Sequence, residues 1–251
     1  MFLLALFTLN TFYISYHAMT STELNEAMDF LRELSANNHK PWMDANRDRY
    51  KLHRGRFERY VEELVDRISV FDPSIAGLKA KDCTYRMNRD IRFSADKSPY
   101  KTHFSAFIAP RGKNSGLGGY YLHLEPRMEG SSMIGHSILA VGEVCLPPVI
   151  LRSIREEIID NGEEMLRNIA AAEGFRIDTE GSLKRTPTGF PSGTPYDELL
   201  RLKDHCLVLD LEEEELYAPN FTERIVGHFR SARPYLQQLN RAIEYGYEEM
   251  M

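Results

Sequence analysis

The stretch FSAFIAPRGKNSGLGGYYLHL, residues 104–124, decides the fold of this 251-residue chain. Apolar side chains recur at every second position from 104 to 108 and again from 120 to 124, which is the pattern of a strand with one buried face. Residues 110–119, between the two patterns, include four glycines and a proline, a composition typical of a loop that joins two strands. We therefore expect an antiparallel hairpin at the centre of the fold.

Amphipathic helices are predicted on both sides of this hairpin. Apolar residues at helical spacing favour a helix from Thr22 to the break at Asn37 and a long helix that ends before Asp72. Pro41 suits the first turn of a helix that begins between them. After the hairpin, the predicted helices are residues 147–158, 163–172 and 221–245, the last of them kinked by Pro234.

Three further strands are expected, at residues 85–93, 132–139 and 206–211. Strands thus cluster in the middle of the chain and helices at its two ends, without a strict alternation of strand and helix. This order favours an α+β fold, one domain over residues 19–251 with a central, mainly antiparallel sheet.

Composition limits the class of protein. The chain has 31 Lys and Arg against 37 Asp and Glu, a net charge of −6, and this balance argues against a protein whose main task is to coat nucleic acid. Its three cysteines have no CxxC spacing, so neither a zinc ribbon nor a disulfide framework is indicated. We expect a soluble, cytoplasmic protein.

Residues 1–18 form an apolar N-terminal extension that has neither the positively charged first part nor the small-x-small cleavage site of a secretory signal. Polar residues interrupt the run, so it is a poor membrane span. The alternatives are a mis-assigned start at Met19, a weak signal or anchor, and a segment that packs on the body. Thr20 and Glu23 match a capping box, which favours Met19 as the start, and no integral membrane association is expected.

The densest polar signal is the segment from Tyr85 to His103. If residues 85–93 form a strand, Arg89 shares a face with apolar side chains and needs a partner or a ligand there. Guanidinium groups suit phosphate and carboxylate. Two more cations, Lys184 and Arg185, lie in a later Gly- and Pro-rich loop that could close over the same pocket. The candidate ligand-binding residues are Arg86, Arg89, Asp90, Arg92, Lys97, Tyr100, Lys101, Lys184 and Arg185. The alternative is an internal Arg–Asp network that pins a loop to the sheet.

Proton transfer is assigned to His123, Tyr121 and His103 as candidate catalytic residues, since the two histidines lie on adjacent predicted strands. Tyr121, His123 and Glu125 share one face at a period of two. Metal binding would require two or three such groups to converge, and no metal-binding spacing is present. We therefore predict no metal and no cofactor.

Four motifs carry a resemblance to a known family. They are Phe30–Leu34 with Asn37, Asn38 and Trp42; the segment from Asp82 to His103; the segment from Gly119 to Pro126; and Lys184–Arg185 with Gly189–Phe190. On these the chain resembles, from about Met28 to Tyr245, the bacterial and fungal proteins grouped as domain of unknown function 2461 (DUF2461). The resemblance implies identity but no activity. Relatives usually carry a glycine-rich run after Pro126, and the run here has fewer glycines, so a pocket lined by it would be narrower.

Three functions are compatible with these residues. The favoured one is binding or processing of a small anionic ligand, phosphate- or carboxylate-bearing, through the Arg/Lys/His cluster, with the question of enzymatic activity left open. The second is a structural or interaction module in which the motif is a folding network. The third, disfavoured by the net charge, is a nucleic-acid-associated protein that also uses the Arg-rich helix around residues 47–59. The oligomeric state is left open.

Overall fold

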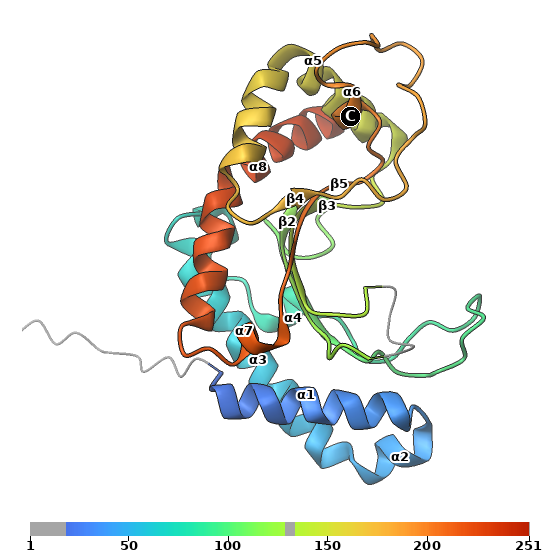
Figure 1. Ribbon diagram of the computed structural model, residues 1–251, viewed down its shortest axis with the longest axis vertical. Coiled ribbons are helices and arrows are strands. Elements are labelled where there is room, and N and C mark those ends of the chain that lie inside the picture. The colour runs from blue at the N-terminus through green and yellow to red at the C-terminus, as the bar shows by residue number, and fades with distance from the viewer. Residues whose placement is uncertain (1–18, 129–133, 251) are drawn as a thin grey trace, which may run out of the picture.

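A five-stranded antiparallel sheet, in the order β1-β2-β3-β5-β4, forms the centre of the computed structural model, which describes residues 19–128 and 134–250 (Figure 1). The strands are β1 (Phe104–Ile108), β2 (Gly119–Leu124), β3 (Ile138–Glu143), β4 (Arg176–Ile177) and β5 (His205–Asp210). The helices are α1 (Ser21–Ala36), α2 (Lys40–Ala45), α3 (Arg47–Ser69), the 3-10 helix η1 (Pro73–Ile75), α4 (Ala80–Cys83), α5 (Pro148–Ala171), α6 (Asp197–Leu200), α7 (Glu213–Leu216) and α8 (Phe221–Glu248). The predicted α+β class, with helices at both ends of the chain, is confirmed.

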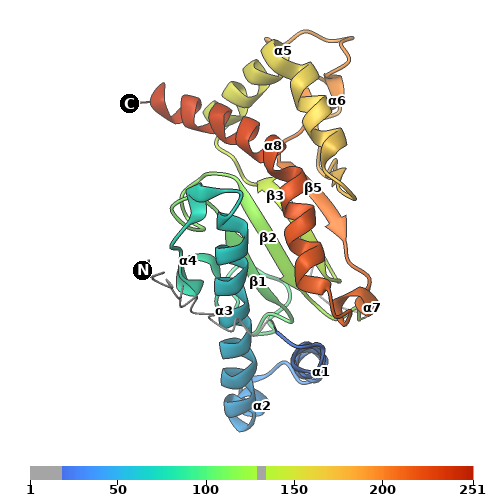
Figure 2. The same cartoon turned by 90° about the vertical axis from the view of Figure 1, so that its left-hand side faces the viewer.

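One face of the sheet is covered by α3 and α8, which lie in front of the strands in Figure 2. The apolar positions of the predicted hairpin point into this core, and Tyr120 is fully buried in it. The Tyr120 hydroxyl donates a hydrogen bond of 2.8 Å to the Asp72 carboxylate, which satisfies both buried groups.

The opposite face carries the alternate residues of the hairpin and is here called the second face. In the antiparallel register of β1 and β2, Ser105 lies opposite His123 and Phe107 lies opposite Tyr121. Because successive side chains of a strand point to opposite sides, these residues turn away from α3 and α8. The hairpin alternation thus separates an apolar core face from a face with polar groups.

The predicted strand at residues 85–93 is wrong. This segment is irregular: Thr84, just before it, bridges Ala106 of β1, the Tyr85 amide donates to the Ser105 carbonyl at 3.3 Å, and Asn88 bridges Tyr100 of the same loop. Short polar side chains bind the local backbone instead: the Asp90 carboxylate accepts the Arg92 amide, which competes with a strand ladder. Phe93, expected on an apolar face, is 96% exposed.

Other boundaries differ from those expected. The strand predicted at 132–139 lies at 138–143, and the helices predicted at 147–158 and 163–172 form one element, α5, with non-helical backbone angles at Asn161. Helix α8 contains Pro234 and bends along its length in Figure 2, as its missing amide donor predicts. The capping box of Thr20 and Glu23 is present at the start of α1. Residues 1–18 lie outside the described residues.

Within the described residues, the helices are all too short or too polar to cross a bilayer.

Candidate functional site

The second face brings His103 and His123, two of the three candidate catalytic residues, together with Glu125 at the end of β1 and β2 where the hairpin opens. His103 immediately precedes β1, and Glu125 immediately follows β2. Because Phe104 pairs with Leu124, extending the antiparallel register by one residue sets His103 opposite Glu125, and His123, two residues before Glu125 on the same face, lies diagonal to His103. Strand pairing therefore assembles residues that are twenty or more positions apart in the sequence.

A chain of hydrogen bonds links Tyr121, His123 and Glu125. The Tyr121 hydroxyl lies 2.9 Å from His123 Nδ1, and His123 Nε2 lies 2.9 Å from Glu125 Oε2. The imidazole and the carboxylate are each only about 1% exposed. Burial raises the pKa of Tyr121 to about 12, so this hydroxyl keeps its proton at neutral pH. Two distinct ring nitrogens with two polar partners give His123 the geometry of a proton carrier.

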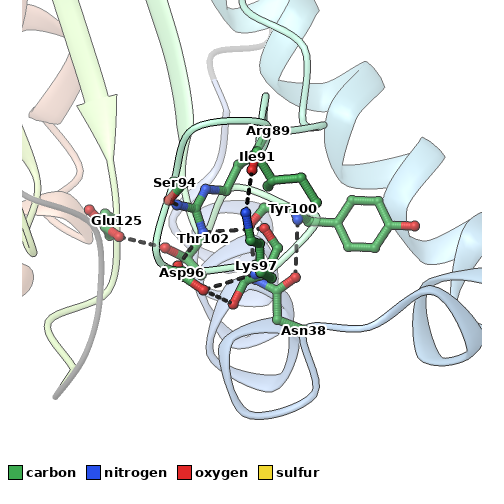
Figure 3. A network of polar contacts seen from close by, with 10 residues as sticks. Asn38, Arg89, Ile91, Ser94, Asp96, Lys97, Tyr100, Thr102 and Glu125 are labelled. Atoms are coloured by element: carbon green, nitrogen blue, oxygen red, sulfur yellow. Dashed lines mark hydrogen bonds and ion pairs between the residues drawn. The ribbon is translucent and has the colours of Figure 1, made fainter.

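Glu125 is held from a second direction by the segment before β1. The Thr102 hydroxyl donates a 2.7 Å hydrogen bond to Glu125 Oε1. Figure 3 shows the two side chains facing each other from segments that are adjacent in space. The Glu125 amide also donates to Ser137 Oγ at 3.0 Å. The carboxylate is thus held by Thr102 and His123, and the backbone of Glu125 is held by Ser137.

His103 packs against His123, with ring centroids 4.2 Å apart. Burial, with the neighbouring His123 second, lowers the pKa of His103 to about 3, so its ring is neutral at physiological pH. Its Nδ1 atom is buried and has no hydrogen-bond partner within the described residues. A buried polar atom without a partner costs about 1–3 kcal/mol, and such an atom marks a place where a further group can bind.

A group of cations borders this histidine pair. Lys101 is half-buried, with its ammonium 5.2 Å from the centre of the Tyr85 ring. Burial lowers the pKa of Lys101, and the positive charges of Arg86 and Arg54 lower it further. Among the residues that the structure describes, neither Lys101 nor Arg86 forms an ion pair with a carboxylate. Positive charge is thus concentrated at Lys101 and Arg86, whereas Arg54 pairs with Glu58.

The other predicted anion-binding residues of this segment mainly serve the loop of residues 85–103 itself. Arg89 forms an ion pair with Asp96 (Figure 3). It also donates to the Ser98 carbonyl at 3.2 Å. Arg92 pairs with Asp90 in an exposed contact. These contacts match the internal Arg–Asp network given above as the alternative.

Lys97 and Tyr100 also hold the loop. The Lys97 ammonium donates to the Ile91 carbonyl at 3.0 Å. The Asn38 side chain bonds both the amide and the carbonyl of Tyr100, and the buried Tyr100 ring points away from the polar network in Figure 3. Arg89, Arg92, Lys97 and Tyr100 are therefore all engaged within the loop or with Asn38.

Lys184 and Arg185 lie elsewhere. Both are exposed, in a loop that lies with α5 and α6, at the opposite end of the molecule from the loop of residues 85–103 in Figure 1. The following residues, 187–191, line a cavity of about 870 Å³ with α5 and α8. The two cations are therefore not brought to the hairpin site.

Four residues near the site were missed from the sequence: Arg54, Tyr85, Thr102 and Ser105. Arg54 reaches across from α3 to the Tyr85 carbonyl and the Thr84 hydroxyl, at 2.6 Å each. Ser105 lies opposite His123 across the hairpin, so the same period of two that identified Tyr121 and His123 in the sequence could have identified Ser105. Nothing in the local sequence distinguishes Arg54 from the other arginines of its helix.

Comparison with known proteins identifies one family. The family model of the conserved hypothetical proteins called DUF2461 matches residues 26–237. No curated protein matches, and no solved structure does.

Proposed function

The chain belongs to the DUF2461 family of conserved hypothetical proteins, and we propose that it binds a small phosphate- or carboxylate-bearing ligand on the second face of its sheet. The observation that carries the proposal is the half-buried ammonium of Lys101, which lies near Arg86 and Arg54 and lacks a carboxylate partner in the described residues. Placing like charges together is unfavourable, and an anion in their midst removes that cost.

The site also supports processing of the ligand. The Tyr121 hydroxyl and the two histidines lie beside the cations, and a bound anion would orient the remainder of the ligand toward them. Tyr121 would donate the proton of its hydroxyl to the ligand, and a proton from His123 Nδ1 would replace it on the hydroxyl oxygen. Arg89, Arg92 and Lys97 are left out of the ligand set, since their contacts are within the loop.

The test is the thermal unfolding of the protein in phosphate, sulfate and chloride at matched ionic strength. Each charge-assisted contact contributes about 1.5–3 kcal/mol, so two or three of them give millimolar binding after ordering costs. Phosphate and sulfate should stabilise the protein more than chloride, and Lys101→Met should abolish the difference. Lys97→Met, in the same loop and bonded only to a carbonyl, should preserve it. Equal stabilisation by the three salts contradicts the proposal.

The interaction-module alternative has one specific observation in its favour. Phe93 is 96% exposed in a loop whose arginines hold it together internally, and an exposed aromatic side chain on a braced loop suits contact with another protein. Identical behaviour in all three salts makes this alternative the better one. A cytoplasmic location fits both functions, since Cys83, Cys145 and Cys206 are unpaired thiols.

Nucleic-acid binding is less well supported. The Arg-rich surface of α3 is largely paired: Arg47 with Asp44, Arg49 with Glu33, Arg54 with Glu58, and Arg56 with Glu23 and Glu26. Such pairs leave little free charge for a phosphate backbone. A weak dependence of DNA binding on salt concentration is the expected result.

A further inference from the structure

His103, His123 and Glu125 have a capacity that anion binding does not use. Each residue offers one ligand atom: the two histidines offer an imidazole nitrogen each, and Glu125 offers a carboxylate oxygen. These three atoms lie within 4.8 Å of one another. We propose that these three residues bind a divalent transition metal ion, for which Zn²⁺ is the reference ion. This goes beyond the proposed anion site and replaces our expectation from sequence that no metal is bound.

The spacing is close to that of a metal site. Ligand atoms bound to a tetrahedral zinc ion at about 2.0–2.1 Å lie roughly 3.4 Å from each other. The His123 Nε2 to Glu125 Oε2 separation is already 2.9 Å, so these two groups need to open slightly and His103 needs to approach. Rotation of side chains is enough for this change, because the strand register already holds the three residues together.

The donor set determines the class of ion. Two imidazoles and one carboxylate are typical ligands of zinc and of iron(II), whereas magnesium and calcium prefer oxygen alone. Three protein ligands also leave at least one coordination position for water or a substrate, which is the arrangement of catalytic rather than structural zinc sites. Anionic ligands held by Lys101 would lie on the same face.

The groups around the three ligands match those that support bound metals. A histidine ligand usually gives its other ring nitrogen to a polar partner, and a ligating carboxylate is usually hydrogen-bonded as well. Here Tyr121 contacts His123 Nδ1, and Thr102 donates to Glu125 Oε1. With the metal bound at His123 Nε2 and Glu125 Oε2, these two contacts occupy the remaining atoms, His123 Nδ1 and Glu125 Oε1.

His103 supplies the remaining observation. Its Nδ1 atom is buried without a hydrogen-bond partner in the described part of the chain, although its ring packs directly on His123. The residue is only half-buried, so the site has a side by which an ion can reach it. His123 and Glu125, which are almost fully buried, form the inner wall.

The experiment is a titration of the full chain, first stripped of metal by a chelator, with Zn²⁺ under calorimetric detection and with Co²⁺ under visible absorption. We expect one equivalent of either ion to bind and the cobalt spectrum to indicate a coordination number below six. His103→Asn should abolish stoichiometric binding. Thr102→Val, which keeps all three ligands, should weaken binding by about 10- to 100-fold. Mg²⁺ should not compete.

His228→Asn is the matched control, because this partly exposed histidine hydrogen-bonds a backbone carbonyl and packs on Phe175, and its replacement should leave the affinity unchanged. If His103→Asn does not fold, Thr102→Val decides. The proposal is overturned if wild-type protein binds no stoichiometric Zn²⁺, or if His103→Asn and Thr102→Val both bind it as tightly as the wild type. The phosphate experiment is performed with chelator present, so that either proposal can fail without the other.

Discussion

Replacing Arg89 with methionine tests whether the loop of residues 85–103 is braced internally or is a ligand site. The side chain is 27% exposed, and its guanidinium donates to Asp96, to the Ser98 carbonyl at 3.2 Å and to Ser94 Oγ at 3.3 Å. The ion pair adds little because its carboxylate is solvated. The two remaining hydrogen bonds contribute about 1 kcal/mol each at most, and methionine retains the packing of the stem. The expected loss of unfolding free energy is about 1–2 kcal/mol.

Urea unfolding at neutral pH measures this loss, and the phosphate titration of the same variant measures ligand binding. Stability should fall by the stated amount, and stabilisation by phosphate should remain. Arg92→Met is the control, since its guanidinium is 76% exposed and pairs with an exposed aspartate, and no measurable change in stability is expected. A loss above 3 kcal/mol would indicate a buried ion pair. Loss of phosphate binding at unchanged stability would return Arg89 to the ligand set and refute the assignment of its contacts.

Four further substitutions test the body of the fold. Tyr120→Phe leaves the buried Asp72 carboxylate without its 2.8 Å donor and should cost about 1–3 kcal/mol in urea unfolding. The buried imidazole of His205 has its pKa lowered to about 3 from 6.5, so the unfolded chain takes up a proton below pH 6.5 that the folded chain refuses. Stability should fall as the pH drops from about 6.5 towards 3, and His205→Leu should reduce that slope by about 1.4 kcal/mol per pH unit. Gly142→Ala forces a side chain into the His205 carbonyl at a φ of +141° and should destabilise the protein severely, whereas Gly227→Ala, exposed in α8 with open space around it, should stabilise it by about 0.5–1 kcal/mol.

The parts of the fold that could be predicted from the sequence are those in which burial imposes a period. Phe104, Ala106 and Ile108 contact the core because α3 covers one side of the strand, and the resulting alternation is visible without a structure. The capping box of α1 is equally local, since a threonine and a glutamate three residues apart satisfy each other's backbone. In both cases the sequence pattern that reveals the structure extends over only a few residues.

The segment at 85–93 has the same alternation and is not a strand. On its apparent apolar face Met87 is buried in the core, but Phe93 has no surface to pack on, and Asp90 finds nearer partners in the amide and the guanidinium of Arg92. Alternation therefore predicts a strand only where one face is covered, and coverage is a property of the tertiary structure. The same limitation explains Arg54, whose contact with Tyr85 spans 31 residues and is absent from any local pattern.

The candidate site falls between these two cases. His103, His123 and Glu125 are identified from the sequence, which also predicts the hairpin that joins them. Their convergence nevertheless depends on the register of one strand pair. With Phe104 opposite Leu124, His103 faces Glu125; a slip of one residue would turn His123 into the core and separate the three groups. The loop of residues 110–119 does not specify that register by its glycines alone. It follows from the match of two apolar faces against α3 and α8, so the same packing that stabilises the core also assembles the polar cluster on the other side of the sheet.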